Sequence, residues 1–388
     1  MTGPILQPPT RKSVLRRAVA KLIPGLLMAL LLLPLLARGQ QSPNFDEVEA
    51  SATAAREQGD VSRAAELYRQ AVELRPNWPD GWWYLGILQY GSNAYAPAAD
   101  ALSHFINLTP NAGPALALRG LCEFEQAQYP QSLQDLQRAI ALGAANEPRN
   151  AGIIFYHEAL LLTRLGRYEE ALAQYTTLVK HGSLSDDVYA GIGLAGLRMP
   201  LLPKDIDSSQ QQMVLKVGQA AASVMNGDLT AGREAFQNLF TLFPATPNIH
   251  YLYGYLLFTV DPTEAIAQFR RELNVSPASA VAHSMLAWAL GTQGDFTAAL
   301  PYAKQSVAED PSLAVTQLVL GKDLVETGDV NAGLPHLEAA LKIDPQNLEA
   351  HIALAKAYSE LGRKDDARRE RLLCLTLSGK QAAPDANF

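Results

Sequence analysis

The chain has 388 residues, of which 48% are hydrophobic and 18% are charged, a balance typical of folded proteins and not of disordered ones. Helix-forming residues dominate and hairpin signals are absent, so we expect an all-α fold. The formal net charge is -7, and subtracting the six basic side chains of residues 1–39 leaves -13 on the rest, which disfavours nucleic-acid binding.

Residues 1–39 are typical of a targeting segment. A basic stretch precedes an apolar run over residues 22–37, and the small residues Ala37 and Gly39, two positions apart, precede a predicted cleavage position after Gly39. This order predicts a signal peptide and an exported protein, either periplasmic or secreted. The run contains Pro24 and Pro34 and is shorter than the roughly 20 residues of a membrane span. An uncleaved signal anchor, with membrane contact, is the alternative.

The rest of the chain carries an internal repeat. Residues 59–76, 294–311 and 328–345 each begin with Gly-Asp, have a small residue five positions after the glycine, and end in proline. This pattern predicts a tight turn at Gly-Asp and a second helix that ends at the proline, where the next unit begins. The terminal prolines are mostly 34 residues apart, at Pro76, Pro110, Pro244, Pro277, Pro311 and Pro345.

Small residues also recur mid-way along the first helix of each unit. Glycine inside a helix costs about 1 kcal/mol relative to alanine, so its recurrence at one phase predicts a close approach of the partner helix. These positions are Gly86, Gly120, Gly254, Ala287, Gly321 and Ala355.

The repeat resembles the tetratricopeptide-repeat (TPR) family. Residues 82–90 read WWYLGILQY, close to the family pattern of an aromatic residue, Leu-Gly and Tyr at set offsets. The resemblance implies a superhelical solenoid of antiparallel helix pairs. We predict nine units, at residues 45–78, 79–112, 113–146, 152–185, 213–246, 247–279, 280–313, 314–347 and 348–377.

The units fall into two arrays. Residues 45–185 form a predicted N-terminal array and residues 213–377 a C-terminal one, followed by a flexible tail over 378–388. Residues 186–212 are an irregular insert with one predicted helix at 186–198 and a stretch rich in helix breakers. We leave two interpretations open for the insert, a hinge or a degenerate repeat.

The insert holds the only sequence that matches a cofactor motif. Gly191, Gly193 and Gly196 have the spacing of a dinucleotide-binding loop, but no strand precedes them and no βαβ unit surrounds them. We therefore predict close helix packing at these glycines and no cofactor.

Neither metal nor catalytic chemistry is predicted. His250, His283 and His351 share the fourth position of their units, so a solenoid aligns them without converging them on an ion. We expect them to replace the family's aromatic residue there. Cys122 and Cys374 are too far apart in the repeat order for a disulfide. No catalytic motif is present, which predicts a protein that is not an enzyme.

A partner-binding groove follows from the resemblance. TPR proteins generally bind along the face made by the first helices, and the family's inward positions are the second, fifth, ninth and twelfth. The residues at these positions form two aromatic patches, one on each side of the insert. They are Trp83, Ile87, Tyr90, Leu121, Phe124, Tyr156 and Leu160, then Asn248, Tyr251, Tyr255, Phe258 and Trp288.

Lys322 and Lys356 occupy the ninth position of two successive units and predict a local basic spot in an acidic protein. They do not reproduce the Lys, Asn and Arg set of the carboxylate clamp in chaperone-binding TPR proteins. A solvated charged face is the alternative.

The function that we expect is a non-catalytic scaffold outside the cytoplasm, binding a peptide or partner protein in envelope assembly or secretion. A polysaccharide-binding module is the alternative, because stacked aromatic rings also suit sugars. A subunit whose catalytic part lies on another chain is a third interpretation.

Overall fold

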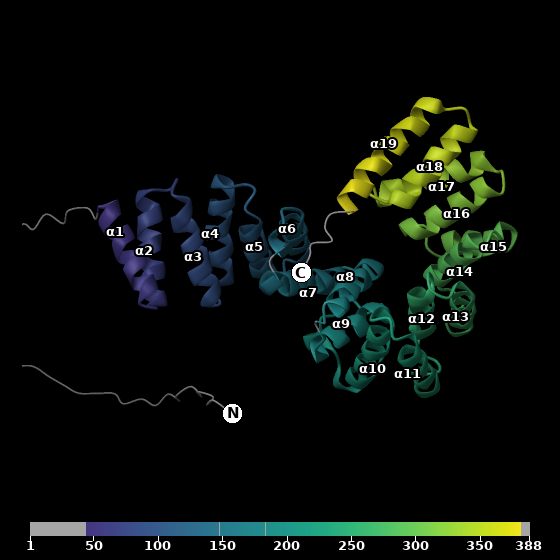
Figure 1. The fold of residues 1–388 in the computed structure, drawn as a ribbon, viewed down its shortest axis with the longest axis horizontal. Helices are drawn as coiled ribbons and strands as arrows, with labels where there is room; N and C mark the ends of the chain where they lie inside the picture. The colour runs from purple at the N-terminus through teal and green to yellow at the C-terminus, as the bar shows by residue number, and fades with distance from the viewer. Residues whose placement is uncertain (1–43, 147, 183, 382–388) are drawn as a thin grey trace, which may run out of the picture. The chain divides into compact units, whose positions relative to one another are not determined.

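Helix pairs make up the described chain, as the period predicts. The computed structural model describes residues 44–146, 148–182 and 184–381, so the predicted signal peptide lies outside it. Within these residues 19 α-helices and two 3-10 turns occur, and no strand (Figure 1). The all-α prediction is confirmed.

Eight helices precede the insert as four pairs. Successive helices of a pair lie antiparallel in Figure 1 and contact one another. The pairs are α1 (Phe45–Glu57) with α2 (Val61–Leu74), α3 (Pro79–Gly91) with α4 (Tyr95–Leu108), α5 (Gly113–Glu125) with α6 (Tyr129–Ala141), and α7 (Pro148–Arg164) with α8 (Tyr168–Lys180). The short turn η1 (Ala144–Asn146) lies between α6 and α7.

Five further pairs follow the insert, so the nine predicted helix pairs are all present. They are α10 (Ser208–Met225) with α11 (Leu229–Leu242), α12 (Ile249–Leu257) with α13 (Pro262–Val275), α14 (Ala280–Thr292) with α15 (Phe296–Glu309), α16 (Ala314–Glu326) with α17 (Val330–Ile343), and α18 (Leu348–Glu360) with α19 (Lys364–Gln381). The insert itself holds α9 (Asp186–Gly196) and the turn η2 (Pro203–Asp205).

The Gly-Asp dipeptides form the turn inside several units. The glycines adopt a left-handed backbone, with φ of +75° at Gly59 and +92° at Gly328, which costs glycine little because it has no Cβ. The following aspartate caps the next helix, as Asp60 does by accepting a hydrogen bond of 3.1 Å from the backbone N–H of Arg63. The dipeptide therefore ends one helix and starts the next.

The recurrent glycines of the first helices lie where the second helix of the unit crosses. A Cβ added at Gly321 would lie 2.7 Å from Cγ of Leu337, and one at Gly86 would lie 2.8 Å from Cγ of Leu102. Both distances are shorter than carbon atoms tolerate, so only glycine fits. The predicted packing role of these residues is confirmed.

The glycines of the insert pack against three neighbours. A Cβ at Gly193 would lie 2.0 Å from the backbone oxygen of Val214 on α10, one at Gly191 would meet the ring of Tyr175 on α8, and one at Gly196 would meet Leu252 on α12. This motif is thus the contact surface of a buried helix, and the predicted helix packing is confirmed.

Polar contacts tie the segment after α9 to both arrays. The side chain of Arg164 donates a hydrogen bond of 2.9 Å to the backbone oxygen of Pro200, and Asn248 donates one of 3.1 Å to that of Leu197. The largest hydrophobic cluster also continues through this region, from Ala98 to Leu324. Residues 186–212 are therefore packed on both sides, and the hinge interpretation stays a prediction.

Some boundaries differ from the predicted ones. Helix α10 begins at Ser208, inside the predicted insert, because Asp207 caps it through a hydrogen bond of 2.8 Å to the N–H of Ser209. Helix α19 continues to Gln381, so the first residues of the predicted tail are helical. Besides its charges, α19 exposes Leu372 and Leu375, which are 55% and 71% accessible.

Candidate partner-binding groove

The first helices of several neighbouring units contact one another. Helix α5 contacts α3 and α7, and α16 contacts α14 and α18. Side chains at equivalent positions of these helices therefore lie beside one another along the repeat. We call this surface the first-helix face.

Aromatic rings of the N-terminal array are partly exposed on the first-helix face. Trp83 packs beside Phe105 with ring centres 5.4 Å apart, and the rings of Phe124 and His157 meet edge to face at 4.9 Å. Tyr156, Tyr90 and Leu121 are also partly exposed, and Ile87 is exposed. These rings are held by neighbours and still present an edge to solvent.

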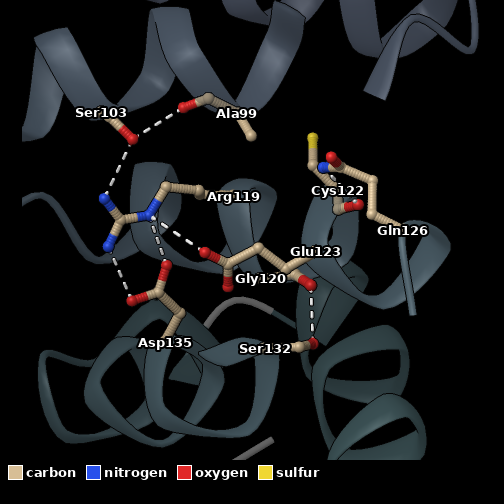
Figure 2. A network of polar contacts seen from close by, with 9 residues as sticks. All are labelled: Ala99, Ser103, Arg119, Gly120, Cys122, Glu123, Gln126, Ser132 and Asp135. Carbon is tan, nitrogen blue, oxygen red and sulfur yellow. Dashed lines mark hydrogen bonds and ion pairs between the residues drawn. The ribbon is translucent and has the colours of Figure 1, made fainter. Parts of the chain in front are cut away.

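A partly buried ion pair is formed by Arg119, on the same helix as Phe124. Arg119 occupies a seam position where other units have leucine, and its Nε and Nη2 donate to the two carboxylate oxygens of Asp135 at 2.5 and 2.8 Å. Its Nη1 donates to Ser103 at 3.2 Å, which links α4, α5 and α6 (Figure 2). Glu123 lies 3.9 Å from the same guanidinium. Burial raises the pKa of Glu123 to about 7.

A second group of rings follows the insert. Phe258 and Trp288 meet at 6.0 Å in an edge-to-face arrangement, and both are partly exposed. The ammonium of Lys322 lies 5.5 Å above the Trp288 ring, within the range of a cation–π contact. Tyr255, on α12, is also partly exposed.

Three predicted groove residues instead have structural positions. Leu160 and Tyr251 are only 4% and 2% exposed, because the neighbouring helices cover them. Asn248 has a left-handed backbone with φ of +71° and directs its amide to the backbone oxygen of Leu197. These side chains hold the array together and do not present a binding surface.

The predicted basic spot is also wrong, because both lysines face carboxylates. The ammonium of Lys356 lies 2.5 Å from Oε2 of Glu326 and 3.9 Å from Oε1 of Glu360. The ammonium of Lys322 lies 3.7 Å from Oε2 of Glu349. The surface of α16 and α18 is therefore close to neutral at these positions.

Two adjoining cavities open the first-helix face near its end. One of about 70 Å³ lies between α16 and α18, beside Ile352, which is 47% exposed. The other, of about 30 Å³, lies between α14 and α16 and is lined by Trp288, Gly291 and Asp323 among others. Lys322 lines both cavities.

Asp323 is the buried charged group of this site. The residue is 2% exposed, and its Oδ2 has no hydrogen-bond partner among the described residues. Burial raises the pKa of its carboxyl to about 7, with a smaller opposing effect of Lys322. No sequence motif marks Asp323, since the repeat has no acidic residue at this position in the other units.

The histidines at the fourth position join the two helices of their own units. Nδ1 of His283 lies 2.9 Å from Oε2 of Glu309, and Nδ1 of His250 lies 2.7 Å from Oε1 of Gln268. His351 pairs in the same way with Glu370 at 2.6 Å. The structure thus gives each of them a packing partner within its unit.

The described residues contain no cluster of His, Cys, Asp or Glu that could hold a metal ion, and none of their helices is long and apolar enough to cross a membrane. Cys122 and Cys374 are both free thiols. Burial raises the pKa of Cys122 to about 12, which makes it unreactive at neutral pH.

Repeated helix pairs with a 34-residue period, whose first helices contact one another in several places, define a helical-repeat protein. Family models of the tetratricopeptide repeat match three segments, residues 53–93, 261–314 and 324–370. These three segments of the chain therefore contain tetratricopeptide repeats. Repeats of this family support a role as a protein-interaction scaffold. No curated protein matches the chain.

Three solved structures are among those with some similarity to the chain. MamA is 19% identical and aligns over 42% of this chain and 97% of its own, with a TM-score of 0.37. YrrB, described as a TPR protein with an unusual peptide-binding site, is 16% identical and aligns over 42% of this chain and 84% of its own, with a TM-score of 0.35. The APC/C hetero-tetramer Cut9-Hcn1 is 15% identical and aligns over 86% of this chain and 66% of its own, with a TM-score of 0.35. The family assignment rests on the three sequence matches.

Proposed function

We propose that this protein is a non-catalytic scaffold that binds an extended peptide or a helix of a partner protein along the first-helix face. The observation that carries the proposal is the run of partly exposed rings on neighbouring first helices, from Trp83 to Phe124 and again from Tyr255 to Trp288. Exposed rings that are already held by neighbours offer large contact area at little entropic cost.

The binding face comprises fewer residues than the sequence predicts. Ile87, Leu121 and Tyr156 belong to it by exposure, and Ile352 adds an exposed apolar side chain near its end. The buried Leu160 and Tyr251 support it from behind. The paired lysines Lys322 and Lys356 are expected to contribute their stems and not a net charge.

We also propose that the protein works outside the cytoplasm, in envelope assembly or secretion. The support is the order of basic, apolar and small residues in 1–39. Sequencing the N-terminus of the protein isolated from its host tests this proposal. A first residue just after Gly39 supports it, and a chain that starts at Met1 points to a membrane anchor.

The binding role is tested by co-purification of partners with the full-length protein and its variants. Trp83→Ala and Tyr255→Ala should each reduce recovery of the same partner at least tenfold while far-UV circular dichroism stays unchanged. Leu242→Ala is the matched control, because this side chain is 57% exposed on α11, a second helix.

The outcomes separate the alternatives. If Leu242→Ala and Trp83→Ala affect recovery equally, the first-helix face is not the binding surface. If no protein partner depends on these rings but an array of glycans binds, the scaffold proposal fails and a polysaccharide-binding role replaces it.

A further inference from the structure

The cavity between α14 and α16 is lined by a buried carboxyl group, that of Asp323. Oδ2 of Asp323 is buried without a hydrogen-bond partner among the described residues, although a buried carboxylate is costly unless it is paired. Lys322 compensates this carboxyl only in part, because its ammonium lies above the Trp288 ring and 3.7 Å from Glu349. An anionic group is therefore available inside the face that we propose binds a partner.

The cavity has room for one small polar group. Its volume is about 30 Å³, and a water molecule needs roughly 10–15 Å³ of such space. An ammonium group is of similar size and is a compact point charge, whereas a planar guanidinium is larger. The ring of Trp288, which already has the ammonium of Lys322 5.5 Å from its centre, lines the cavity together with the apolar Leu318, and both can contact an alkyl chain.

We propose that this cavity receives the ammonium of a lysine side chain from the bound partner, with Asp323 as its anion and Trp288 as its aromatic wall. The inference rests on the proposed peptide-binding function and deepens it by naming one residue of the partner. The stem of that lysine lies along Leu318 and Trp288, and its ammonium replaces whatever water the cavity holds. Lysine is preferred to arginine for reasons of size.

Binding is expected to depend on pH. The charged groups that act on the pKa of Asp323 are Lys322, which lowers it, and Glu326, which raises it, both on its own helix. The α14 and α15 residues that line the cavity carry no titratable group, and Glu349 on α18 pairs with Lys322. Burial raises the pKa of Asp323 to about 7, so part of the carboxyl is protonated at neutral pH. A bound ammonium favours the carboxylate, and affinity for a lysine peptide should therefore increase from pH 6 to pH 8.

The first experiment selects binders to the full-length protein from a random library of twelve-residue peptides. Wild-type protein should enrich lysine at one position next to apolar or aromatic residues, and Asp323→Asn should lose that lysine while keeping the apolar preference. The control is Asp365→Asn, which removes an exposed carboxylate from α19. It should select the same lysine as wild type.

The second experiment uses the best peptide in three forms, with lysine, arginine or the neutral isostere norleucine at the selected position. Affinity for wild type should fall at least tenfold with norleucine and less with arginine. The chain has four tryptophans, so fluorotryptophan labelling gives four fluorine NMR signals, of which Trp288→Phe identifies one. Only the lysine peptide should shift that signal strongly.

Two results would overturn the inference. If lysine and norleucine peptides bind wild type equally, and Trp288→Ala still weakens both, the first-helix face binds peptides but Asp323 does not select a lysine. If the library yields no peptide for any variant, both the lysine pocket and the peptide-binding function are wrong.

Discussion

Tyr251 on α12 donates a hydrogen bond of 2.7 Å to Oε1 of Glu169 on α8, joining residues on either side of the segment 186–212. Arg198, which follows α9, forms an ion pair with the same carboxylate. Its guanidinium also lies 4.7 Å from the centre of the Tyr168 ring. One carboxylate thus fixes the two arrays to each other at the point where the repeat is interrupted.

Tyr251→Phe removes this hydrogen bond and keeps the ring. We expect the free energy of unfolding to fall by about 1.5–3 kcal/mol, the usual contribution of a hydrogen bond to a charged group, with Arg198 still pairing Glu169. Urea denaturation measures the change. Tyr302→Phe is the control, since its hydroxyl makes no hydrogen bond to the described residues and should change little.

The same variant tests the hinge interpretation. If Glu169 and Tyr251 hold a junction that otherwise bends, amide hydrogen exchange in α9 and α12 should increase in Tyr251→Phe while exchange in α5 and α16 stays unchanged. Uniform exchange in all four helices would argue that residues 186–212 are a packed part of the repeat.

Gly193→Ala tests the packing of the insert. The added methyl would lie 2.0 Å from the backbone oxygen of Val214, and a backbone atom cannot move aside as a side chain end can. We expect a loss of roughly 3 kcal/mol or more in the free energy of unfolding. The control is Gly152→Ala in α7, where a Cβ meets nothing within 4 Å. That change should be neutral or stabilise by up to about 1 kcal/mol.

The period predicted most of this architecture because its signals are local. Glycine at a turn and a small residue at a helix crossing are each required by geometry within one unit, so Gly328 and Gly321 can be interpreted from sequence alone. The insert was harder to interpret. Its glycines contact α8, α10 and α12, and nothing in a 34-residue repeat specifies those neighbours.

Ala127 offers a stabilising substitution. It follows α5 with φ of +58°, a left-handed backbone that costs a residue with a Cβ roughly 1–2 kcal/mol, whereas most other units have glycine there. Ala127→Gly should raise the free energy of unfolding by about 0.5–1 kcal/mol after the entropic cost of glycine is subtracted. Gly59→Ala, at φ of +75° with open space around it, should have the opposite sign.

The position of the first-helix face could be predicted from the resemblance to the TPR family, but the exposure and charge of its side chains could not. Equivalent positions in a repeat differ in what the next unit places over them, so Trp83 is partly exposed while Tyr251, at the same position of its unit, is buried. Charge depends likewise on neighbours, since Glu326 lies one turn from Lys322 and pairs with Lys356 on the next first helix. Asp323 belongs to no sequence motif, and it is identified only by its Oδ2 atom, which is buried without a hydrogen-bond partner among the described residues.

Glu158 on α7 should make stability depend on pH. It is 4% exposed, its Oε1 accepts a hydrogen bond of 3.3 Å from Gln137, and its Oε2 has no partner among the described residues. Burial raises its pKa to about 7 in the folded protein, above a value of about 4.3 in the unfolded chain. Between these values only the folded state holds the proton, so stability falls as the pH rises through this window.

Glu158→Gln removes that titration and keeps the shape of the side chain, including an oxygen that can accept from Gln137. The wild type should therefore lose roughly 3 kcal/mol relative to Glu158→Gln between pH 4.5 and pH 7.5. Glu123 and Asp323, whose pKa values burial also raises to about 7, titrate in both proteins and cancel in the difference. Urea denaturation at half-unit pH intervals measures this difference in the free energy of unfolding. Parallel curves for the two proteins would contradict the prediction, because they would show that Glu158 is ionised in the folded state throughout, with a carboxylate that is solvated or paired.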